Sequence, residues 1–258
     1  MRLTVIGSGS AFGAIGANAA YCVDGRMLVD CGAPMTQLLP RAGIDVHAID
    51  MVLVTHFHYD HVAHLPLFLG ARALESDAPR PLALAGPPGT FEYVERLLAT
   101  GYGAQLLEAI TRRLKPGSLV LQDGTDVTVE GYRLRAFAVV HSRGPSLAYA
   151  ITGPDGATVG FSGDTTVCAG LHRAIDASDL FVCECTGWDG PVPTHLWSGE
   201  VAELMRLHPR TRFLLSHLAQ RGTLAGALVA HDRLTLDVTA TDRVLRGAPG
   251  SGATAAGG

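Results

Sequence analysis

The sequence predicts an α/β protein in which two β-sheets are packed between helices. The first observation is composition, because 47% of the 258 residues are hydrophobic and 17% are charged, as is typical of a globular chain. The second is length, since a chain of this size can bury roughly 70% or more of its unfolded surface. The third is the order of the patterns: short apolar runs typical of strands occur in both halves of the chain, with helical segments beside them.

The N-terminal part contains short strands separated by Gly-rich turns, and the helix predicted after them has Pro34 just ahead of it. A further short apolar run is typical of a fully buried strand. The strands are expected at residues 3–6, 19–23, 26–29 and 51–54. The helices are expected at residues 35–42, 65–74, 91–100 and 105–114.

The hydrophobic period then changes, and consecutive strands are predicted at residues 119–121, 127–130, 134–140, 147–151 and 158–161. The last part alternates again, with helices at residues 171–174, 198–207 and 224–230 and strands at 180–183 and 213–215. We expect one domain over residues 1–246. Residues 247–258 hold only Gly, Ala and Ser apart from Pro249 and Thr254, so a disordered tail is predicted there.

Charge and cysteine content argue against several classes of protein. Twenty Lys and Arg against 24 Asp and Glu give a formal net charge of −4, whereas proteins that bind long nucleic acid through their overall field usually carry a basic surplus. The five cysteines include no Cys-x-x-Cys pair, so a reducing compartment, the cytoplasm, is predicted rather than a disulfide framework. Because no run of ~18 apolar residues is present, we expect no membrane span.

The strongest functional signal is the sequence His56-x-His58-x-Asp60-His61, which directly follows a predicted buried strand. Side chains in a loop that leaves a strand can converge, so that residues i and i+2 reach one cation and residues i+4 and i+5 a second. Imidazole and carboxylate groups suit zinc or iron. The alternative is a His-rich surface loop. His64 is expected to be an ordinary residue of the following helix.

Three further polar residues each follow an apolar strand, namely His141, Asp164 and His217. A single polar residue at a strand end is more often a cap or a turn residue. Three such residues in a chain that also holds the histidine cluster make a better case for additional metal ligands.

Together these residues resemble the metallo-β-lactamase fold superfamily, and within it the ribonuclease Z-like phosphodiesterases. The resemblance extends from Met1 to about Gly222. The branch is indicated by Glu184-x-Thr186 and by His195. The matching segments, in chain order, are Gly7-Ser8-Gly9-Ser10-Ala11, Leu28-Val29-Asp30-Cys31-Gly32, the cluster at 56–61, Phe161-Ser162-Gly163-Asp164-Thr165, Glu184-Cys185-Thr186 and Ser216-His217.

The resemblance implies a four-layer αββα sandwich with its site at one edge, between the two sheets. It also implies two divalent cations, which we expect to be zinc, with manganese or iron as alternatives. One cation would be held by His56, His58 and His141. The second would be held by Asp60, His61 and His217, and Asp164 would bridge the two.

The catalytic residues that the resemblance implies are Asp60, His195 and Glu184. Two neighbouring cations lower the pKa of a bridging water, so that hydroxide is available near pH 7 for attack on the substrate. His195 would act as the general acid, with Glu184 bonded to the other ring nitrogen. The alternative for His195 is a plain residue at a helix start.

One departure from the family concerns the partner. Ribonuclease Z carries a long arm that grips transfer RNA between the positions of His141 and Asp164, and here these residues are only 23 positions apart. We therefore expect a small-molecule substrate and no long nucleic acid. A homodimer is expected only because ribonuclease Z-like proteins are commonly dimers.

Other departures concern side chains that are predicted to contact the substrate. Tyr59 would wall the pocket, Trp197 together with Trp188 would line an apolar part of it, and Arg143 would meet a substrate anion. The alternatives are a packed aromatic for Tyr59, core positions for both tryptophans, and a solvated arginine.

The predicted function is therefore that of a metal-dependent hydrolase of a small phosphodiester, cyclic ones included. The first alternative is a carboxylic ester, lactone or β-lactam hydrolase on the same site, and the second is a mononuclear iron dioxygenase. A binding protein with a retained fold is disfavoured because all seven expected ligands are present. Cys168 has no base beside it in the pattern and is expected to be a small buried hydrophobe rather than a nucleophile.

Overall fold

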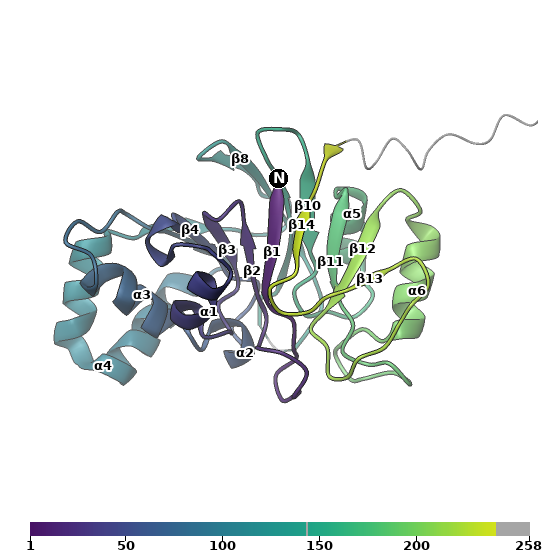
Figure 1. Ribbon diagram of the computed structural model, residues 1–258, viewed down its shortest axis with the longest axis horizontal. Coiled ribbons are helices and arrows are strands. Elements are labelled where there is room, and N and C mark those ends of the chain that lie inside the picture. Colours follow the sequence, from purple (N-terminus) through teal and green to yellow (C-terminus); the bar gives the residue numbers. More distant parts are fainter. Residues whose placement is uncertain (143, 241–258) are drawn as a thin grey trace, which may run out of the picture.

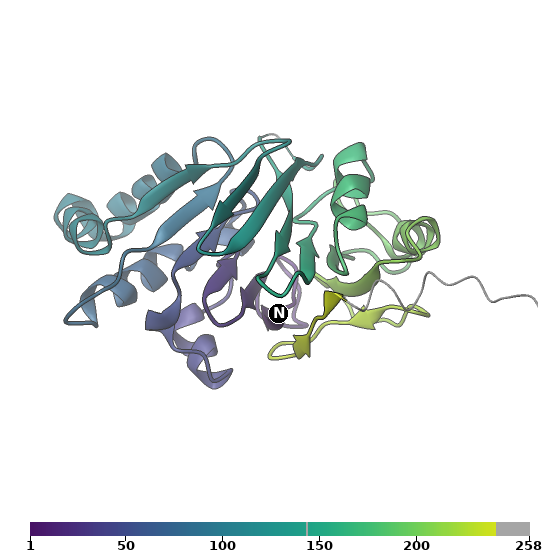
Figure 2. The same cartoon turned by 90° about the horizontal axis from the view of Figure 1, so that it is seen from above.

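The computed structural model describes residues 1–142 and 144–240. The predicted tail at 247–258 and Arg143 lie outside the described residues. Two seven-stranded sheets face each other, and helices cover the outer side of each (Figures 1 and 2). No helix in the described part of the chain is both long and apolar enough to cross a membrane.

The first sheet comes mainly from the N-terminal half and carries helices on its outer face. Its strands, in spatial order, are β14 (Thr235–Asp237), β1 (Arg2–Gly7), β2 (Ala20–Val23), β3 (Met27–Val29), β4 (Met51–Leu53), β5 (Ala83–Gly86) and β6 (Gly117–Val120). The helices of this half are α1 (Met35–Arg41), the 3₁₀ turn η1 (Val46–Ala48), α2 (Tyr59–Val62), α3 (Leu65–Leu74) and α4 (Thr90–Leu114).

The second sheet comes from the C-terminal half, and its helices lie on the opposite side of the molecule (Figure 1). Its strands, in spatial order, are β13 (Leu228–Val229), β12 (Arg212–Ser216), β11 (Leu180–Glu184), β10 (Thr158–Phe161), β9 (Leu147–Thr152), β8 (Tyr132–Ala138) and β7 (Asp126–Val129). Its helices are α5 (Ala169–Asp176) and α6 (Ser198–Leu207).

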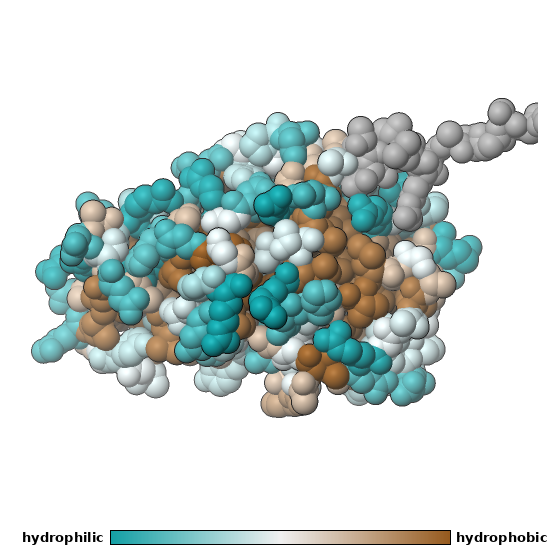
Figure 3. Space-filling model, viewed as in Figure 1, coloured by the Kyte–Doolittle hydropathy of each residue, from teal (hydrophilic) through white to brown (hydrophobic). Residues whose placement is uncertain are grey.

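Three hydrophobic cores separate the four layers. The middle core packs the two sheets together through side chains such as Val5, Tyr149 and Leu214. The two outer cores pack α1, α3 and α4 on the first sheet and α5 and α6 on the second. The central strands of both sheets are therefore buried on both faces. This burial accounts for the unbroken apolar runs of the sequence. The face seen in Figure 3 is mostly hydrophilic, with hydrophobic residues showing between the polar ones near the middle.

Most predicted elements are present, with the differences at positions where packing overrides local pattern. The helix predicted at residues 224–230 is wrong: Gly226 has a φ of +84°, and Leu228 and Val229 pair in parallel with β12. Strands β5 and β14 were not predicted, since β5 is rich in alanine, a weak strand former. The two helices predicted at 91–100 and 105–114 are joined in α4 across a kink at Gly103.

The strand directions bring one set of chain ends together. In the first sheet β3 and β4 run parallel, and in the second β10, β11 and β12 run parallel. Strand β8 points the same way as β10, because both are antiparallel to β9. The loops that follow these strands therefore emerge at a common edge of the sandwich, which is where open α/β sheets place their ligands.

Two glycines of the helices make a matched test of this packing. A Cβ at Gly170 of α5 would lie 1.8 Å from the Ala138 carbonyl oxygen of β8, whereas a Cβ at Gly70 of α3 would meet no atom within 4 Å. We expect Gly170→Ala to destabilise the protein by about 1–3 kcal/mol through overpacking. Gly70→Ala should stabilise it by about 0.5–1 kcal/mol, because alanine loses less entropy in a helix. Urea unfolding measures both, and equal effects of the two substitutions would contradict this packing.

Candidate metal centre

The predicted ligands all lie at the common edge of the two sheets. The cluster at 56–61 follows β4, and the other three residues follow β8, β10 and β12 of the second sheet. His217 immediately follows the last residue of β12 and has a φ of +56°. The ligands of the two halves therefore face each other only because the sheets pack in this register.

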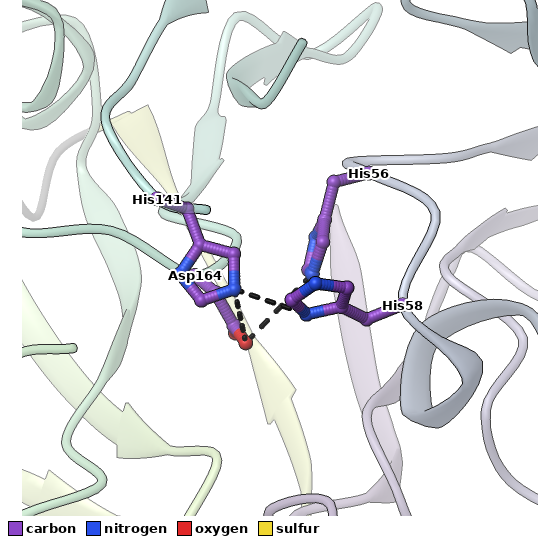
Figure 4. Close-up of side chains that lie close together, drawn as sticks. All are labelled: His56, His58, His141 and Asp164. Atoms are coloured by element: carbon purple, nitrogen blue, oxygen red, sulfur yellow. Dashed lines mark hydrogen bonds and ion pairs between the residues drawn. The ribbon is translucent and has the colours of Figure 1, made fainter. Parts of the chain in front are cut away.

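Four side chains from the two halves point toward one another in Figure 4, namely His56, His58, His141 and Asp164. The Nδ1 atom of His58 lies 3.1 Å from Nε2 of His141. Asp164 Oδ2 lies 3.8 Å from His56 Nε2 and 3.7 Å from His141 Nε2. A ring of imidazole nitrogens around one carboxylate oxygen is a donor set that zinc prefers.

A second group shares the same carboxylate. Asp60 Oδ2 lies 3.1 Å from His217 Nε2 and 3.5 Å from His61 Nε2. Asp164 Oδ1 lies 3.2 Å from His61 Nε2, and its Oδ2 lies 3.4 Å from His217 Nε2. The structure therefore brings all seven predicted ligands together in two groups that meet at Asp164.

The ring nitrogen of each histidine that points away from the centre has its own partner, as metal-binding histidines usually do. Those partners hold each ring in one orientation and leave the inward nitrogen available. They are Thr55 Oγ1 for His56 at 3.0 Å, Ser142 Oγ for His58 at 3.0 Å, Asp30 Oδ2 for His61 at 2.7 Å, the Thr194 carbonyl oxygen for His141 at 2.9 Å, and Thr186 Oγ1 for His217 at 2.8 Å.

Unpaired buried atoms show that these residues fit a bound cation. Nε2 of His56, Nε2 of His61 and Oδ1 of Asp164 are buried, and none makes a well-aligned hydrogen bond within the described residues, although the last two atoms lie 3.2 Å apart as an ion pair. A buried polar atom left without a partner costs about 1–3 kcal/mol. Cations bound between these atoms would remove that penalty, so the donor set matches the metal centre that the sequence predicts.

The charge states of two of these side chains, Asp164 and His56, suit cation binding. Burial alone would raise the pKa of Asp164, but His217 and His61 beside it hold its pKa well below the usual range, so the carboxylate stays ionised. Burial, together with His61, lowers the pKa of His56 well below its usual range. His56 is therefore neutral and offers a lone pair.

His195 forms a pair with a buried carboxylate next to this centre. Its Nδ1 atom lies 3.2 Å from both carboxylate oxygens of Glu184. Burial opposes the charged form of the ring, but Glu184 outweighs burial and raises the pKa of His195. Thr186 Oγ1 donates to Glu184 and lies 2.8 Å from His217 Nδ1, so the pair is connected to the ligand set.

A cavity of about 480 Å³ opens over the centre, which is in the range of small-molecule sites. Tyr59 lines the cavity, and its side chain is 67% exposed. Trp197 and Trp188 are absent from its lining: a Cβ at Gly199 would meet the Trp197 ring, and one at Gly222 would meet the Trp188 ring. Both tryptophans therefore pack against backbone, and Arg143 lies outside the described residues.

Two residues of this region were not singled out from the sequence. Asp30 is buried, with 1% of its surface exposed, and accepts hydrogen bonds from Thr55 and His61. The sequence did contain a signal for Asp30, because a charged residue at the end of an apolar strand needs a polar partner when it is buried. Phe12 lines the cavity from the loop between β1 and β2, and nothing in its sequence context marks it.

Comparison with protein families places this arrangement among known proteins. The sequence pattern described as "Beta-lactamase superfamily domain" matches residues 25–218. Ribonuclease Z of Methanosarcina acetivorans is 27% identical over 281 aligned positions, which cover 86% of this chain and 89% of that protein. Ribonuclease Z of Methanosarcina mazei is 26% identical, and the alignment covers 76% of this chain and 79% of that protein.

Solved structures share the fold. The metallo-β-lactamase fold protein YhfI from Bacillus subtilis superposes with a TM-score of 0.74 at 20% identity, covering 91% of this chain and 98% of that one. The short form of human tRNase Z gives a TM-score of 0.74 at 21% identity, with coverages of 92% and 99%. A diphosphatase from the PhnP family gives 0.68 at 18% identity, with coverages of 92% and 97%.

The buried carboxylate behind His61 yields a prediction for metal affinity. Asp30→Asn keeps the shape of the side chain and tolerates the φ of +60° at this position, but removes the charge that orients and polarises the ring. We expect metal affinity to fall about 10- to 100-fold, measured by competition with a chromogenic chelator. Asp50→Asn, at a surface ion pair far from the centre, is the control, and unchanged affinity in Asp30→Asn would contradict this role.

Proposed function

The chain belongs to the β-lactamase superfamily and is a metal-dependent hydrolase of the metallo-β-lactamase fold, related to ribonuclease Z, and on that premise we propose that it hydrolyses a small phosphodiester with His195 as the proton donor. Cyclic phosphodiesters are included in this class. The observation that carries the proposal is the Glu184–His195 pair beside the ligand set. In this proposal the metal ligands act on the attacking water and the phosphoryl group, and His195 acts on the leaving oxygen.

The metal ligands proposed are the seven residues that meet at the common edge. The first cation would be held by His56, His58 and His141, and the second by Asp60, His61 and His217, with Asp164 shared between them. Five imidazoles among seven ligands favour zinc over a harder cation. Two such cations, when bound, supply an activated water and neutralise charge on the phosphoryl oxygens.

His195 supplies the proton that the leaving oxygen needs. Its Nδ1–H donates to Glu184, which fixes the tautomer and the orientation of the ring. The Nε2 atom makes no hydrogen bond to the described residues, and His195 lines the cavity. A proton at Nε2 is therefore available to a bound substrate. An ester or lactone hydrolase on the same site has no need of a dedicated donor of this kind.

The surroundings of the centre favour a small substrate over a folded RNA. The segment from residue 144 to Asp164 is occupied by β9 and β10 and the short turn that joins them, which leaves no long arm there. The described residues that line the cavity include no Lys or Arg, whereas polyanion binding depends on such contacts. The relatives named ribonuclease Z make precursor transfer RNA the competing substrate to test.

The first test is hydrolysis of bis(p-nitrophenyl) phosphate by the zinc- or manganese-loaded protein. We expect turnover that disappears on chelation and in Asp60→Ala, because Asp60 would hold a cation. Asp189→Ala, an exposed carboxylate outside the ligand set, should keep full activity. Absence of turnover in protein shown to bind metal would reject the phosphodiester class and favour lactones or an iron oxygenase. Efficient cleavage of precursor transfer RNA would reject the small-substrate proposal.

The second test separates proton donation from the rest of the reaction. p-Nitrophenolate leaves without a proton, whereas an alkoxide does not. We expect His195→Ala to lower kcat on a nucleoside cyclic phosphate by about 10²–10⁴-fold and to change kcat on bis(p-nitrophenyl) phosphate far less. Equal losses on both substrates would show that His195 does not donate the proton. His231→Ala, at an exposed histidine, is the control.

The partner of His195 gives this test a pH readout. Glu184 raises the pKa of His195, and a general acid acts only below its pKa. Glu184→Gln should therefore move the alkaline limb of the kcat profile to lower pH for the cyclic phosphate. A profile that does not move, with lower activity at every pH, would indicate that Glu184 only supports the local fold.

A further inference from the structure

Two aromatic side chains stand at the rim of the cavity with most of their surface in solvent. Phe12 is fully exposed and Tyr59 is 67% exposed. Single exposed apolar residues are common on protein surfaces. These two differ because both line the cavity whose floor is formed by His58, Asp60 and His195.

Hydrogen bonds fix the backbone of the turn that carries Phe12. The backbone N–H of Gly13 donates to the Ser10 carbonyl at 3.3 Å, and that of Ser10 donates to Leu218 of the second half at 3.1 Å. The Asn18 side-chain amide donates to the carbonyls of Ser10 and Ala11. The backbone on either side of Phe12 is therefore fixed, although its ring makes no aromatic or cation contact with the described residues. The loop projects at the same end of the molecule as α2 in Figure 1.

Tyr59 reaches the cavity from α2, which follows β4, whereas Phe12 comes from the loop between β1 and β2. It is the first residue of α2 and lies between two proposed ligands, His58 and Asp60. Its hydroxyl makes no hydrogen bond to the described residues, so the ring is not held by a polar contact of its own. The position of its backbone is set by the ligand loop, because Tyr59 lies between His58 and Asp60 in the chain.

The chemistry of the walls points to a neutral planar group. Apart from the two rings and the residues of the centre with His195, the lining consists of Ala11, Ala63, Asn18 and Thr194, and no described lining residue is a Lys or Arg. Such a lining offers no cationic side chain to a second phosphate. An aromatic side chain can stack on a planar ring whatever substituents the ring carries. For nucleobases, each base stacked in this way contributes substantially to the binding free energy.

We propose that Phe12 and Tyr59 form a subsite for one aromatic ring of the substrate, a nucleobase or an aryl group, whose phosphoester then reaches the centre below. This inference rests on the proposed phosphodiesterase function and names its substrate class. The subsite acts equally on the bound substrate and on the transition state. Its loss should therefore raise KM and leave kcat unchanged.

The test is calorimetric titration of the zinc-loaded protein with three monoesters that share a phosphate: thymidine 5′-monophosphate, phenyl phosphate and methyl phosphate. We expect a ring-bearing ester to bind about ten-fold more tightly than methyl phosphate. Phe12→Ala and Tyr59→Ala should each bring that ratio close to one. Phe12→Trp should retain the ratio and Phe12→Leu should not, because only the former keeps an aromatic face.

Controls and a second readout separate this subsite from general effects. Tyr102→Ala removes a partly exposed aromatic of α4 and should leave every affinity unchanged. For bis(p-nitrophenyl) phosphate, Phe12→Ala should raise KM about ten-fold with kcat within about two-fold of the wild type. Tighter binding of the thymidine ester than of the phenyl ester would identify a nucleobase as the occupant, and the reverse order would identify an aryl group.

The outcomes distinguish failure of the subsite from failure of the proposed function. Turnover of bis(p-nitrophenyl) phosphate, with equal affinities for all three monoesters in the wild type and in Phe12→Ala, would overturn the subsite while the phosphodiesterase stands. A ring preference that depends on Phe12, in a protein without phosphodiesterase turnover, would support the subsite and reject the function.

Discussion

The buried carboxylate of Asp164 is the constraint on which the rest of this structure depends. It is 2% exposed and stays ionised in a place where an isolated charge would be very unfavourable. Its oxygens lie within 3.8 Å of nitrogens of five histidines, which come from both halves of the chain. The packing of the two sheets is therefore tied to a concentration of positive charge at their shared edge, supplied by protons or by cations.

Two parallel relays hold the imidazoles around that carboxylate. In the first, His56 contacts the Thr55 hydroxyl, which donates to Asp30. In the second, His217 contacts the Thr186 hydroxyl, which donates to Glu184. Each relay runs from a ring nitrogen through a threonine to a buried carboxylate, so the tautomer of each ring is set from outside the centre. Glu184 also contacts His195, which connects orientation of a ligand to the proposed proton donor.

The proposed aromatic subsite is only partly separate from this centre in the fold. The proposed ligands follow strands, and Tyr59 lies among them on the single turn α2, whereas Phe12 lies on the loop between β1 and β2. Loops can change without disturbing the sheets that position the centre.

The sequence by itself determined the fold class and which polar side chains gather at the common edge of the two sheets. Buried strands such as residues 51–54 and 158–161 are visible as apolar runs, and the four ligand types after the first of them form a pattern with a direct chemical meaning. Local signals of this kind depend on neighbours within a few residues, which is why α3, α6 and β10 could be predicted with their observed bounds.

Tertiary structure decided what neighbours in the chain cannot. Residues 228–229 are a strand because β12 offers them a parallel edge, although their own pattern favours a helix. Trp188 packs on Gly222 instead of lining the cavity, whereas Phe12 lines the cavity although it precedes the ligand cluster by more than forty positions. Asp30 becomes a partner of His61 only when β3 and β4 lie side by side. Each of these contacts joins residues far apart in the chain, so only the packed sheets could establish them.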